Sequence, residues 1–246
     1  MKKLLLSIIF SCFIATSANA NPIISGISTN EINIDTKFQG TEILLFGAKG
    51  DAGNIVIAVR GPKKNFMVTK KERFLGIWHN GSRVKFKNSY SFYSLFSDQD
   101  FDNEDIDQFL SELEIGKNNL QFPTSEESPA KRDEFHLQLI NRLEQNQLYS
   151  AENSKIDFLD ETLFKANLFF PKNISRGVYT VEIYLINEGG LVSFQSIPIY
   201  VNQVGLSASI LDFAYQNSFL YGLLAVLLAL TFGWLANYLF THFVGK

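Results

Sequence analysis

The sequence predicts a mainly β protein, an immunoglobulin-like β-sandwich with a helical insertion, followed by one C-terminal transmembrane helix. Three observations support this fold class. Short segments rich in β-branched and aromatic residues, separated by turn residues, occupy residues 31–96 and 163–201. Residues 98–155 instead contain apolar residues at helical spacing. Residues 219–240 contain no charged side chain.

The composition limits the class of protein. Of the 246 residues, 46% are hydrophobic and 19% are charged, which excludes a disordered chain. The single Cys excludes a disulfide scaffold and any multi-cysteine metal site. The formal net charge of −3 argues against a general nucleic-acid-binding protein, which would be basic.

Residues 1–20 have the pattern of a signal peptide. Lys2 and Lys3 precede an apolar run from Leu4 to Ile14, and Ala18-Asn19-Ala20 has the small residues of a cleavage site. A retained membrane anchor is the weaker alternative, because the apolar run is short for a membrane span. We therefore expect cleavage after Ala20.

A transmembrane helix is predicted at residues 219–240, since 22 helical residues can cross a hydrocarbon core about 30 Å thick. The tail at residues 241–246 ends in Lys246, whereas no Lys or Arg lies between Val204 and Phe219. Together with a cleaved N-terminus, this charge pattern puts the tail in the cytoplasm. Residues 21–205 are then a periplasmic domain of a single-pass inner-membrane protein, and residues 206–218 are a juxtamembrane segment.

Six or so strands are expected before residue 97. The strongest turn signal among them is Asn80-Gly81, which lies between strand-like segments at Phe74–His79 and Arg83–Lys87. Asn-Gly is a preferred sequence for a two-residue hairpin turn. We therefore predict a β-hairpin whose turn is Asn80-Gly81.

Two helices are predicted in the insertion, at about residues 98–155. Apolar residues of the first helix recur at helical spacing: Ile106, Phe109, Leu110 and Leu113. Ser128-Pro129 is typical of a helix start, with an N-cap residue followed by proline. The apolar stripe of this second helix is Phe135, Leu139 and Leu143.

Three strands follow the insertion. In residues 178–186, one predicted face is Tyr179, Val181, Ile183 and Leu185. Arg176-Gly177-Val178-Tyr179 resembles the tyrosine corner of immunoglobulin-like sandwiches, in which a tyrosine ties a connecting loop to the sheet. One sandwich is the preferred interpretation, and two small domains are the alternative.

The sequence contains no recognisable catalytic motif. After the signal peptide it has His79, His136 and His242, which neither cluster nor accompany a G-x-S-x-G or H-E-x-x-H motif. A periplasmic hydrolase that uses His79 is therefore the least favoured function. We expect a non-enzymatic protein without a cofactor or metal.

An acidic run at residues 98–105 partly matches a calcium-binding loop. Asp98, Asp100 and Asp102 match the first three ligand positions of an EF-hand, but Asn103 and Phe109 stand where that loop requires Gly and Glu. Acidic residues also favour the start of a helix. We prefer helix capping to calcium binding.

Six basic residues occur between residues 60 and 73, and Glu72 is the only acid in this interval. They are Arg60, Lys63, Lys64, Lys70, Lys71 and Arg73. The cluster is a candidate contact for an anionic ligand, an anionic lipid surface or a partner. A solvated strand edge with ordinary surface ion pairs is the preferred alternative.

Small residues lie four apart on one face of the predicted transmembrane helix. They are Ala225, Ala229 and Gly233, and Asn237 extends the same face. Small residues at this spacing let a second helix approach closely. A helix that contacts lipid alone is an equal alternative, because Ala and Gly are common in membrane helices.

Six segments are similar to those of a known family. They are Phe38–Gly47, Arg60–Pro62, Lys71–Trp78, Ser91–Tyr93, Tyr221–Val226 and Gly233–Ala236. In this order they resemble the Alph_Pro_TM family of alphaproteobacterial transmembrane proteins. The resemblance covers most of the chain outside residues 98–160. It implies membrane location and topology and supplies no catalytic residues.

The favoured function is that of a membrane-anchored accessory protein in the periplasm. Its partner would be another inner-membrane protein, such as a transporter, or a second copy that binds through the transmembrane helix. The alternative is a module that binds a ligand or an envelope polymer at Arg60–Trp78. The lipid bilayer is an expected contact, and nucleic acid is not.

Overall fold

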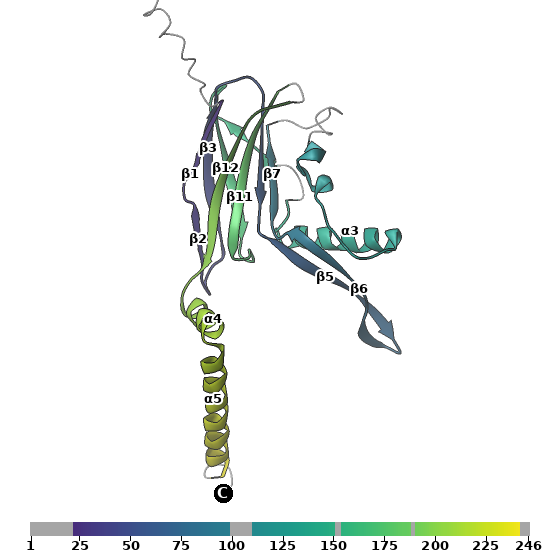
Figure 1. Ribbon diagram of the computed structural model, residues 1–246, viewed down its shortest axis with the longest axis vertical. Helices are drawn as coiled ribbons and strands as arrows, with labels where there is room; N and C mark the ends of the chain where they lie inside the picture. Colours follow the sequence, from purple (N-terminus) through teal and green to yellow (C-terminus); the bar gives the residue numbers. More distant parts are fainter. Residues whose placement is uncertain (1–21, 99–109, 151–153, 188–189, 242–246) are drawn as a thin grey trace, which may run out of the picture.

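The computed structural model describes residues 22–98, 110–150, 154–187 and 190–241. The predicted signal peptide, His242, Asp100 and Asp102 lie outside these ranges. Figure 1 shows long strands stacked together, a hairpin that projects from one side, and a helix that leaves from one end. Strands make up 48% of the structure, which confirms the mainly β class.

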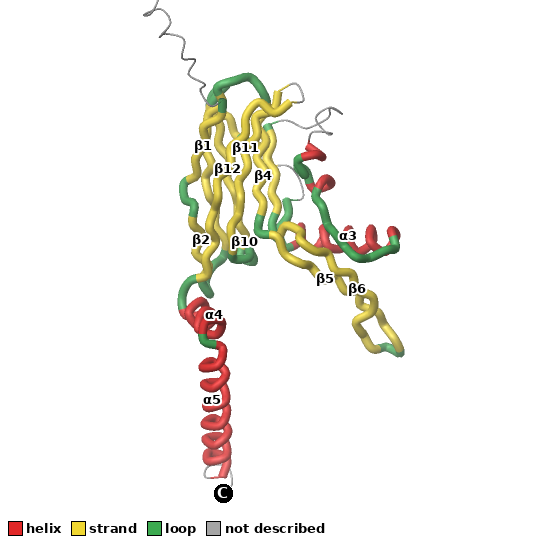
Figure 2. Tube along the Cα trace, in the orientation of Figure 1, coloured by secondary structure: helices red, strands yellow, loops and turns green. Residues whose placement is uncertain are grey.

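Two sheets form the sandwich. Among the described residues, the first has four strands in the order β1 (Ile23–Ile27), β3 (Gly40–Lys49), β10 (Leu163–Pro171) and β9 (Asp157–Phe158). The second has six strands in the order β2 (Glu31–Ile34), β12 (Gly190–Gln203), β11 (Gly177–Asn187), β4 (Asn54–Arg60), β7 (Tyr93–Ser97) and β8 (Ser154–Lys155). The tube in Figure 2 shows the strands running side by side.

The core lies between the facing sheets. The predicted buried face of β11 is confirmed, because the side chains of Tyr179, Val181, Ile183 and Leu185 are fully buried. The Phe170 ring of β10 lies 5.8 Å from the Tyr179 ring, measured between centroids, and 5.3 Å from the Phe92 ring. These aromatic contacts join the two sheets at one end of the sandwich.

The predicted tyrosine corner is present. The Tyr179 hydroxyl donates to the Ser175 carbonyl at 2.9 Å and accepts the Ser175 backbone N–H at 3.0 Å. Burial raises the pKa of Tyr179 to about 12, so the hydroxyl stays protonated and keeps both bonds. The loop before β11 is thereby fixed to the sheet.

The predicted position of the hairpin turn was wrong. The hairpin consists of β5 (Lys63–Phe74) and β6 (Ile77–Tyr90), and its turn is Leu75-Gly76, with φ angles of 47° and 82°. Asn80-Gly81 lies inside β6, where the pairing shifts opposite Lys70. This shift is a β-bulge, in which two residues of one strand face one residue of the other.

Packing explains the register of the hairpin. Pairing Phe66 with Phe86 and Val68 with Val84 gathers four apolar side chains near the root of the hairpin. Val84 and Phe86 are buried, and the Phe86 ring lies 6.3 Å from the Phe122 ring of the insertion. A turn at Asn80-Gly81 would break these pairs, so long-range packing overrides the local turn preference.

The second insertion helix forms as predicted. Helix α3 (Pro129–Gln145) follows the N-cap residue Ser128, and Phe135, Leu139 and Leu143 are buried. A short 3₁₀ helix, η1 (Lys117–Asn119), lies in the loop before it. The first predicted helix lies mostly outside the described residues, although residues 110–112 are helical.

Two helices end the described chain. Helix α4 (Leu206–Gln216) occupies the predicted juxtamembrane segment, and Asn217 interrupts the helical backbone before α5 (Ser218–Leu239). Helix α5 matches the predicted span to within one residue at each end. It is the one helix of the described residues that is long and apolar enough to cross a membrane.

Removing the Tyr179 hydroxyl should destabilise the sandwich. In Tyr179→Phe the Ser175 N–H and carbonyl lose their partner, so we expect the free energy of unfolding to fall by about 1–2 kcal/mol. Urea unfolding of the full chain in detergent, followed by circular dichroism, measures this change. Tyr200→Phe, at a 43% exposed residue, is the control. Equal midpoints for the two variants would contradict the assignment.

Candidate binding surfaces of the hairpin and the membrane helix

Arg60 is a buried structural residue rather than part of a basic surface. Its Nη1 lies 2.6 Å from a Glu182 carboxylate oxygen, and its side chain is 10% exposed. Its Nη2 donates to the carbonyls of Leu113 at 2.7 Å and Glu114 at 3.2 Å. Burial opposes the charge, but the nearby Glu182 carboxylate raises the pKa of Arg60 above its ordinary value. Arg60 therefore joins the insertion to the sandwich and is not available to an external anion.

Lys63 and Lys64 lie at the root of the hairpin. The Lys63 ammonium lies 4.6 Å from the centroid of the Tyr90 ring. The Lys64 ammonium is 3.3 Å from the Ser175 hydroxyl, and partial burial lowers the pKa of Lys64. Both side chains thus contact the base of the hairpin or the loop that Tyr179 holds.

Lys70 and Lys71 line a cleft between β5 and α3. The cleft has a volume of about 420 Å³, and Glu134, Gln138 and Arg142 line it from the helix. The Lys70 ammonium lies 2.8 Å from a Glu134 carboxylate oxygen, and this hydrogen bond raises the pKa of Lys70. Three cations therefore share the cleft with one carboxylate. Arg142 was missed in the sequence because it lies in a distant helix.

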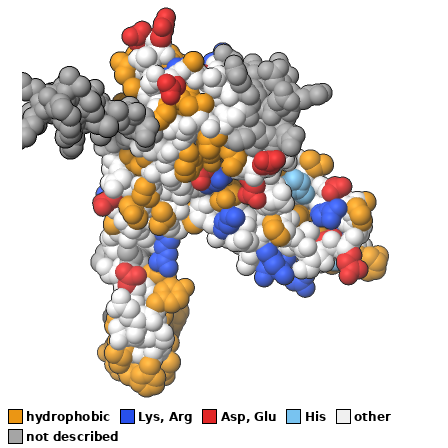
Figure 3. Space-filling view, turned by 45° about the horizontal axis from the view of Figure 1, so that its top comes forward, with side chains coloured by type: hydrophobic (Ala, Val, Ile, Leu, Met, Phe, Trp, Pro, Cys, Tyr) orange, Lys and Arg blue, Asp and Glu red, His pale blue; other side chains and the backbone are white. Residues whose placement is uncertain are grey.

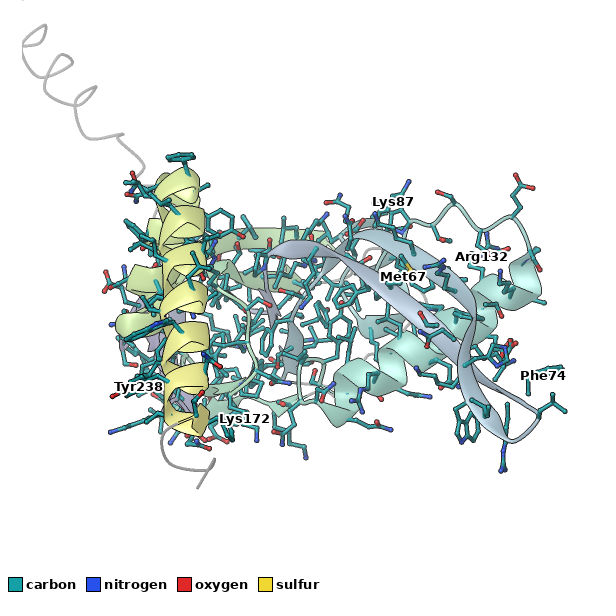
Figure 4. The ribbon with its side chains drawn as sticks, turned by 90° about the horizontal axis from the view of Figure 1, so that it is seen from below. Met67, Phe74, Lys87, Arg132, Lys172 and Tyr238 are labelled. Atoms are coloured by element: carbon teal, nitrogen blue, oxygen red, sulfur yellow. The ribbon has the colours of Figure 1, made fainter. Side chains whose placement is uncertain are left out.

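The free end of the hairpin is apolar. Arg73 is exposed there and donates from Nε to the Gly76 carbonyl at 3.3 Å. We define the hairpin tip as four exposed residues: Phe74 (68% exposed), Leu75 (87%), Ile77 (72%) and Trp78 (66%). Figure 4 shows Phe74 at the far end of the hairpin, and in Figure 3 hydrophobic side chains lie at the same end. An apolar hairpin end was not predicted, because Phe74–His79 was expected to be a strand that leads into a turn at Asn80-Gly81.

The histidines occupy two different environments. His136 packs beside Phe122, with ring centroids 4.6 Å apart, and burial lowers the pKa of His136, which favours the neutral form. His79 lies in the hairpin, with its Nε2 3.8 Å from a Glu72 carboxylate oxygen, and both side chains are about half exposed. The structure thus gives His136 a packing role and leaves His79 on the surface.

Of the acidic run at residues 98–105, the structure describes only Asp98. One carboxylate oxygen of Asp98 accepts the Ile55 N–H at 3.1 Å, which ties the end of β7 to β4. Across the described ranges, no group of three or more His, Cys, Asp or Glu residues could hold a metal ion. Asp100 and Asp102 lie outside those ranges.

The small residues of α5 divide between two environments. Ala225 lines an apolar groove of about 340 Å³ between α4 and α5, together with Phe213 and Tyr221. Ala229, Gly233 and Asn237 are exposed further along the helix. A Cβ atom added at Gly233 would meet no neighbouring atom within 4 Å. Packing within the described chain therefore does not account for the glycine at this position.

Replacing Arg60 should destabilise the chain far more than replacing an exposed lysine of the same cluster. Arg60→Ala leaves the Glu182 carboxylate buried without its counter-ion, which costs about 3–5 kcal/mol of unfolding free energy. Lys70→Ala removes an exposed ion pair and should change stability much less. Urea unfolding of the two full-length variants measures the difference. Similar midpoints would show that Arg60 has no structural role.

The comparisons with known proteins identify a family. No curated protein and no solved structure matches the chain. A family model described as "Putative transmembrane protein (Alph_Pro_TM)" matches residues 22–242, from the start of the first sheet to beyond the end of α5. This match agrees with the one helix of the described residues that could cross a membrane, and with the resemblance seen in the sequence. The chain belongs to the Alph_Pro_TM family of transmembrane proteins.

Proposed function

We propose that the protein is a non-enzymatic, single-span accessory protein of the bacterial inner membrane. Its β-sandwich lies in the periplasm, its C-terminus lies in the cytoplasm, and α5 contacts another membrane protein. Family membership and the apolar helix support the membrane anchor. The signal-peptide pattern and the absence of Lys and Arg between Val204 and Phe219 favour this orientation.

The exposed small-residue face of α5 carries the proposal. Glycine inside a helix costs about 1 kcal/mol relative to alanine. Gly233 has no contact within the described chain that would require its small size. Close approach of a second transmembrane helix requires small residues at the crossing point. A partner helix against Ala229 and Gly233 accounts for both residues.

The surroundings of the histidines favour binding over catalysis. His136 packs among aromatic rings, where burial lowers the pKa of its imidazole and favours the neutral form. His79 is half exposed, and its neighbour Glu72 lies at 3.8 Å. A general base acts in a site that positions it against a nucleophile or a substrate. The hairpin surface around His79 gives little enclosure for such a site.

Bulk added to the small-residue face should remove the partner. In Ala229→Leu with Gly233→Leu, the two leucines prevent close helix approach. Tagged full-length protein, extracted from native membranes in mild detergent, is analysed by affinity capture and mass spectrometry. We expect one multi-span membrane protein with the wild type and its loss in the variant.

The control adds bulk to the opposite side of the same helix. Leu227→Phe with Thr231→Leu changes the residues two positions earlier, about 200° around the helix. This variant should retain the partner. If the partner binds both variants equally, the contact is not through this face. If crosslinking in native membranes yields only the monomer, the accessory function is wrong.

A second candidate function uses the cleft between β5 and α3. Lys70, Lys71 and Arg142 line the cleft together with one carboxylate, that of Glu134, so the cleft has an excess of positive charge. Cationic side chains that converge in a concave site favour an anionic ligand. This cleft is a narrower form of the predicted ligand-binding surface at Arg60–Trp78.

Charge reversal in the cleft tests this candidate. Lys71→Glu with Arg142→Glu reverses two charges, and Lys172→Glu on the exposed surface of the sandwich is the control. Binding of inorganic phosphate and of lipopolysaccharide to the full chain is measured by titration calorimetry. The wild type and the control should bind at least one probe, and the cleft variant should bind neither. Equal binding by all three proteins would exclude the cleft.

A further inference from the structure

We propose that the hairpin tip is a second membrane contact, an apolar wedge that enters the headgroup region of the bilayer crossed by α5. The inference rests on the membrane anchor but not on any partner protein. It goes beyond the basic cluster seen in the sequence, because the apolar tip residues make the contact. Four properties of the hairpin support the proposal: its position relative to α5, the packing that holds its root, the apolar side chains at its tip, and the sequence of its turn.

The hairpin leaves the sandwich at the end that carries the membrane helix. Gly177 pairs with Val201, and β12 ends two residues later at Gln203, just before α4. Pro62, the residue before β5, packs on Gly177, where an added Cβ would lie 2.9 Å from the proline ring. The root of the hairpin and the start of α4 therefore share one end of the sandwich.

The hairpin also points toward the membrane. In Figure 1 it descends on the side of the sandwich from which α5 projects, and its free end reaches the height at which α5 begins. Figure 3 shows the hairpin and α5 as separate projections. The 12 residues of β5 extend about 40 Å at 3.3 Å per residue. A bilayer around α5 would meet the tip at some distance from the helix.

The insertion supports the root half of the hairpin and leaves the tip free. Phe86 is buried, and its ring lies 6.2 Å from the His136 ring of α3 and 6.3 Å from the Phe122 ring. The Lys70–Glu134 ion pair is a further contact with α3. The hairpin is therefore ordered before it meets the membrane, which reduces the entropy lost on contact.

The tip has apolar side chains on both faces and at its end. Phe74 pairs with Ile77 on one face, and Arg73 pairs with Trp78 on the other, while Leu75 projects at the turn. A protein partner with one docking surface would cover one face and leave the other in water. Lipid surrounds an inserted element on all sides. The arrangement therefore favours a bilayer, and the neighbouring Arg73 and Lys71 suit anionic headgroups.

The turn sequence points to the same conclusion. Two-residue hairpin turns with positive φ favour Asn and Gly, yet Leu75 occupies the first position with φ of 47°. Leu75 is also the most exposed residue of the tip, at 87%. An apolar side chain in an unfavourable backbone conformation gains little inside this chain. Contact with lipid would give it a stabilising environment.

Polar residues behind the tip limit the depth of insertion. Glu72 pairs with His79 and Lys71 with Asn80, directly behind the apolar residues. The two edges of an isolated hairpin also expose backbone polar groups, which cannot be buried in hydrocarbon without partners. The tip should therefore enter the interface by about 5–10 Å and not cross the bilayer.

The fluorescence of Trp78 tests the proposal in the full chain. The sequence contains two tryptophans, Trp78 and Trp234, so Trp234→Phe makes Trp78 the sole emitter. The protein is reconstituted into vesicles of phosphatidylcholine and phosphatidylglycerol, in which part of the phosphatidylcholine carries brominated acyl chains. We expect blue-shifted emission, quenching by the brominated lipid and protection from aqueous acrylamide.

Variants distinguish the tip from the membrane anchor. Leu75→Asp with Ile77→Asp should shift the Trp78 emission to the red and remove the lipid quenching, while α5 keeps the protein in the vesicles. Both residues are exposed, so the fold should tolerate the change. Leu159→Asp is the matched control, because Leu159 is 68% exposed and its N–H is bonded to Leu163 at the opposite end of β10 from the helix.

Two results would overturn the proposal. If Trp78 is accessible to acrylamide and unaffected by brominated lipid, the tip lies in water. If Trp78 is protected from acrylamide without lipid quenching, protein covers it, and a second copy is the occupant. The vesicles contain only this protein, so either result leaves the partner of α5 untouched. Conversely, if the affinity capture finds no partner for α5, the proposed contact between the hairpin tip and lipid is unaffected.

Discussion

The buried Arg60–Glu182 ion pair determines how the parts of this protein are arranged. Arg60 ends β4, Glu182 lies in the neighbouring strand β11, and Nη2 of the guanidinium donates to two carbonyls of the insertion. Burying a cation is costly unless its charge is paired, and hydrogen bonds from its N–H groups reduce that cost further. The insertion is therefore fixed at the point where the chain leaves the sandwich to form the hairpin.

The insertion acts as a brace for the hairpin. An isolated two-stranded hairpin is marginally stable in water. Here Val84 and Phe86 are buried, the Phe86 ring packs beside the Phe122 ring of the insertion, and α3 meets β5 through the Lys70–Glu134 pair. The root half of the hairpin thus has a small core of its own. This packing explains how a long, narrow element can hold an apolar tip away from the sandwich.

The sequence predicted those features that depend on interactions between residues close together in the chain. The tyrosine corner at Tyr179, the helix start at Ser128-Pro129 and the apolar span all depend on residues close in the chain. Features that depend on contacts between distant segments were not predictable. The predicted turn at Asn80-Gly81 does not form, because packing against the insertion fixes a different register of the hairpin. Arg60 was predicted to be a surface charge, because its partner Glu182 lies 122 positions away in the sequence.

Two membrane contacts would have a consequence that neither has alone. A single helix such as α5 lets the attached domain rotate about the membrane normal and tilt on its linker, and Asn217 interrupts the helix at that point. A second contact at the hairpin tip, away from α5, would restrict the tilt. Because the hairpin root is joined to the sandwich through Arg60 and Pro62, the restriction would extend to both sheets. The domain would then present one fixed face to any membrane partner bound at Ala229 and Gly233, so lipid contact would lower the entropic cost of that association.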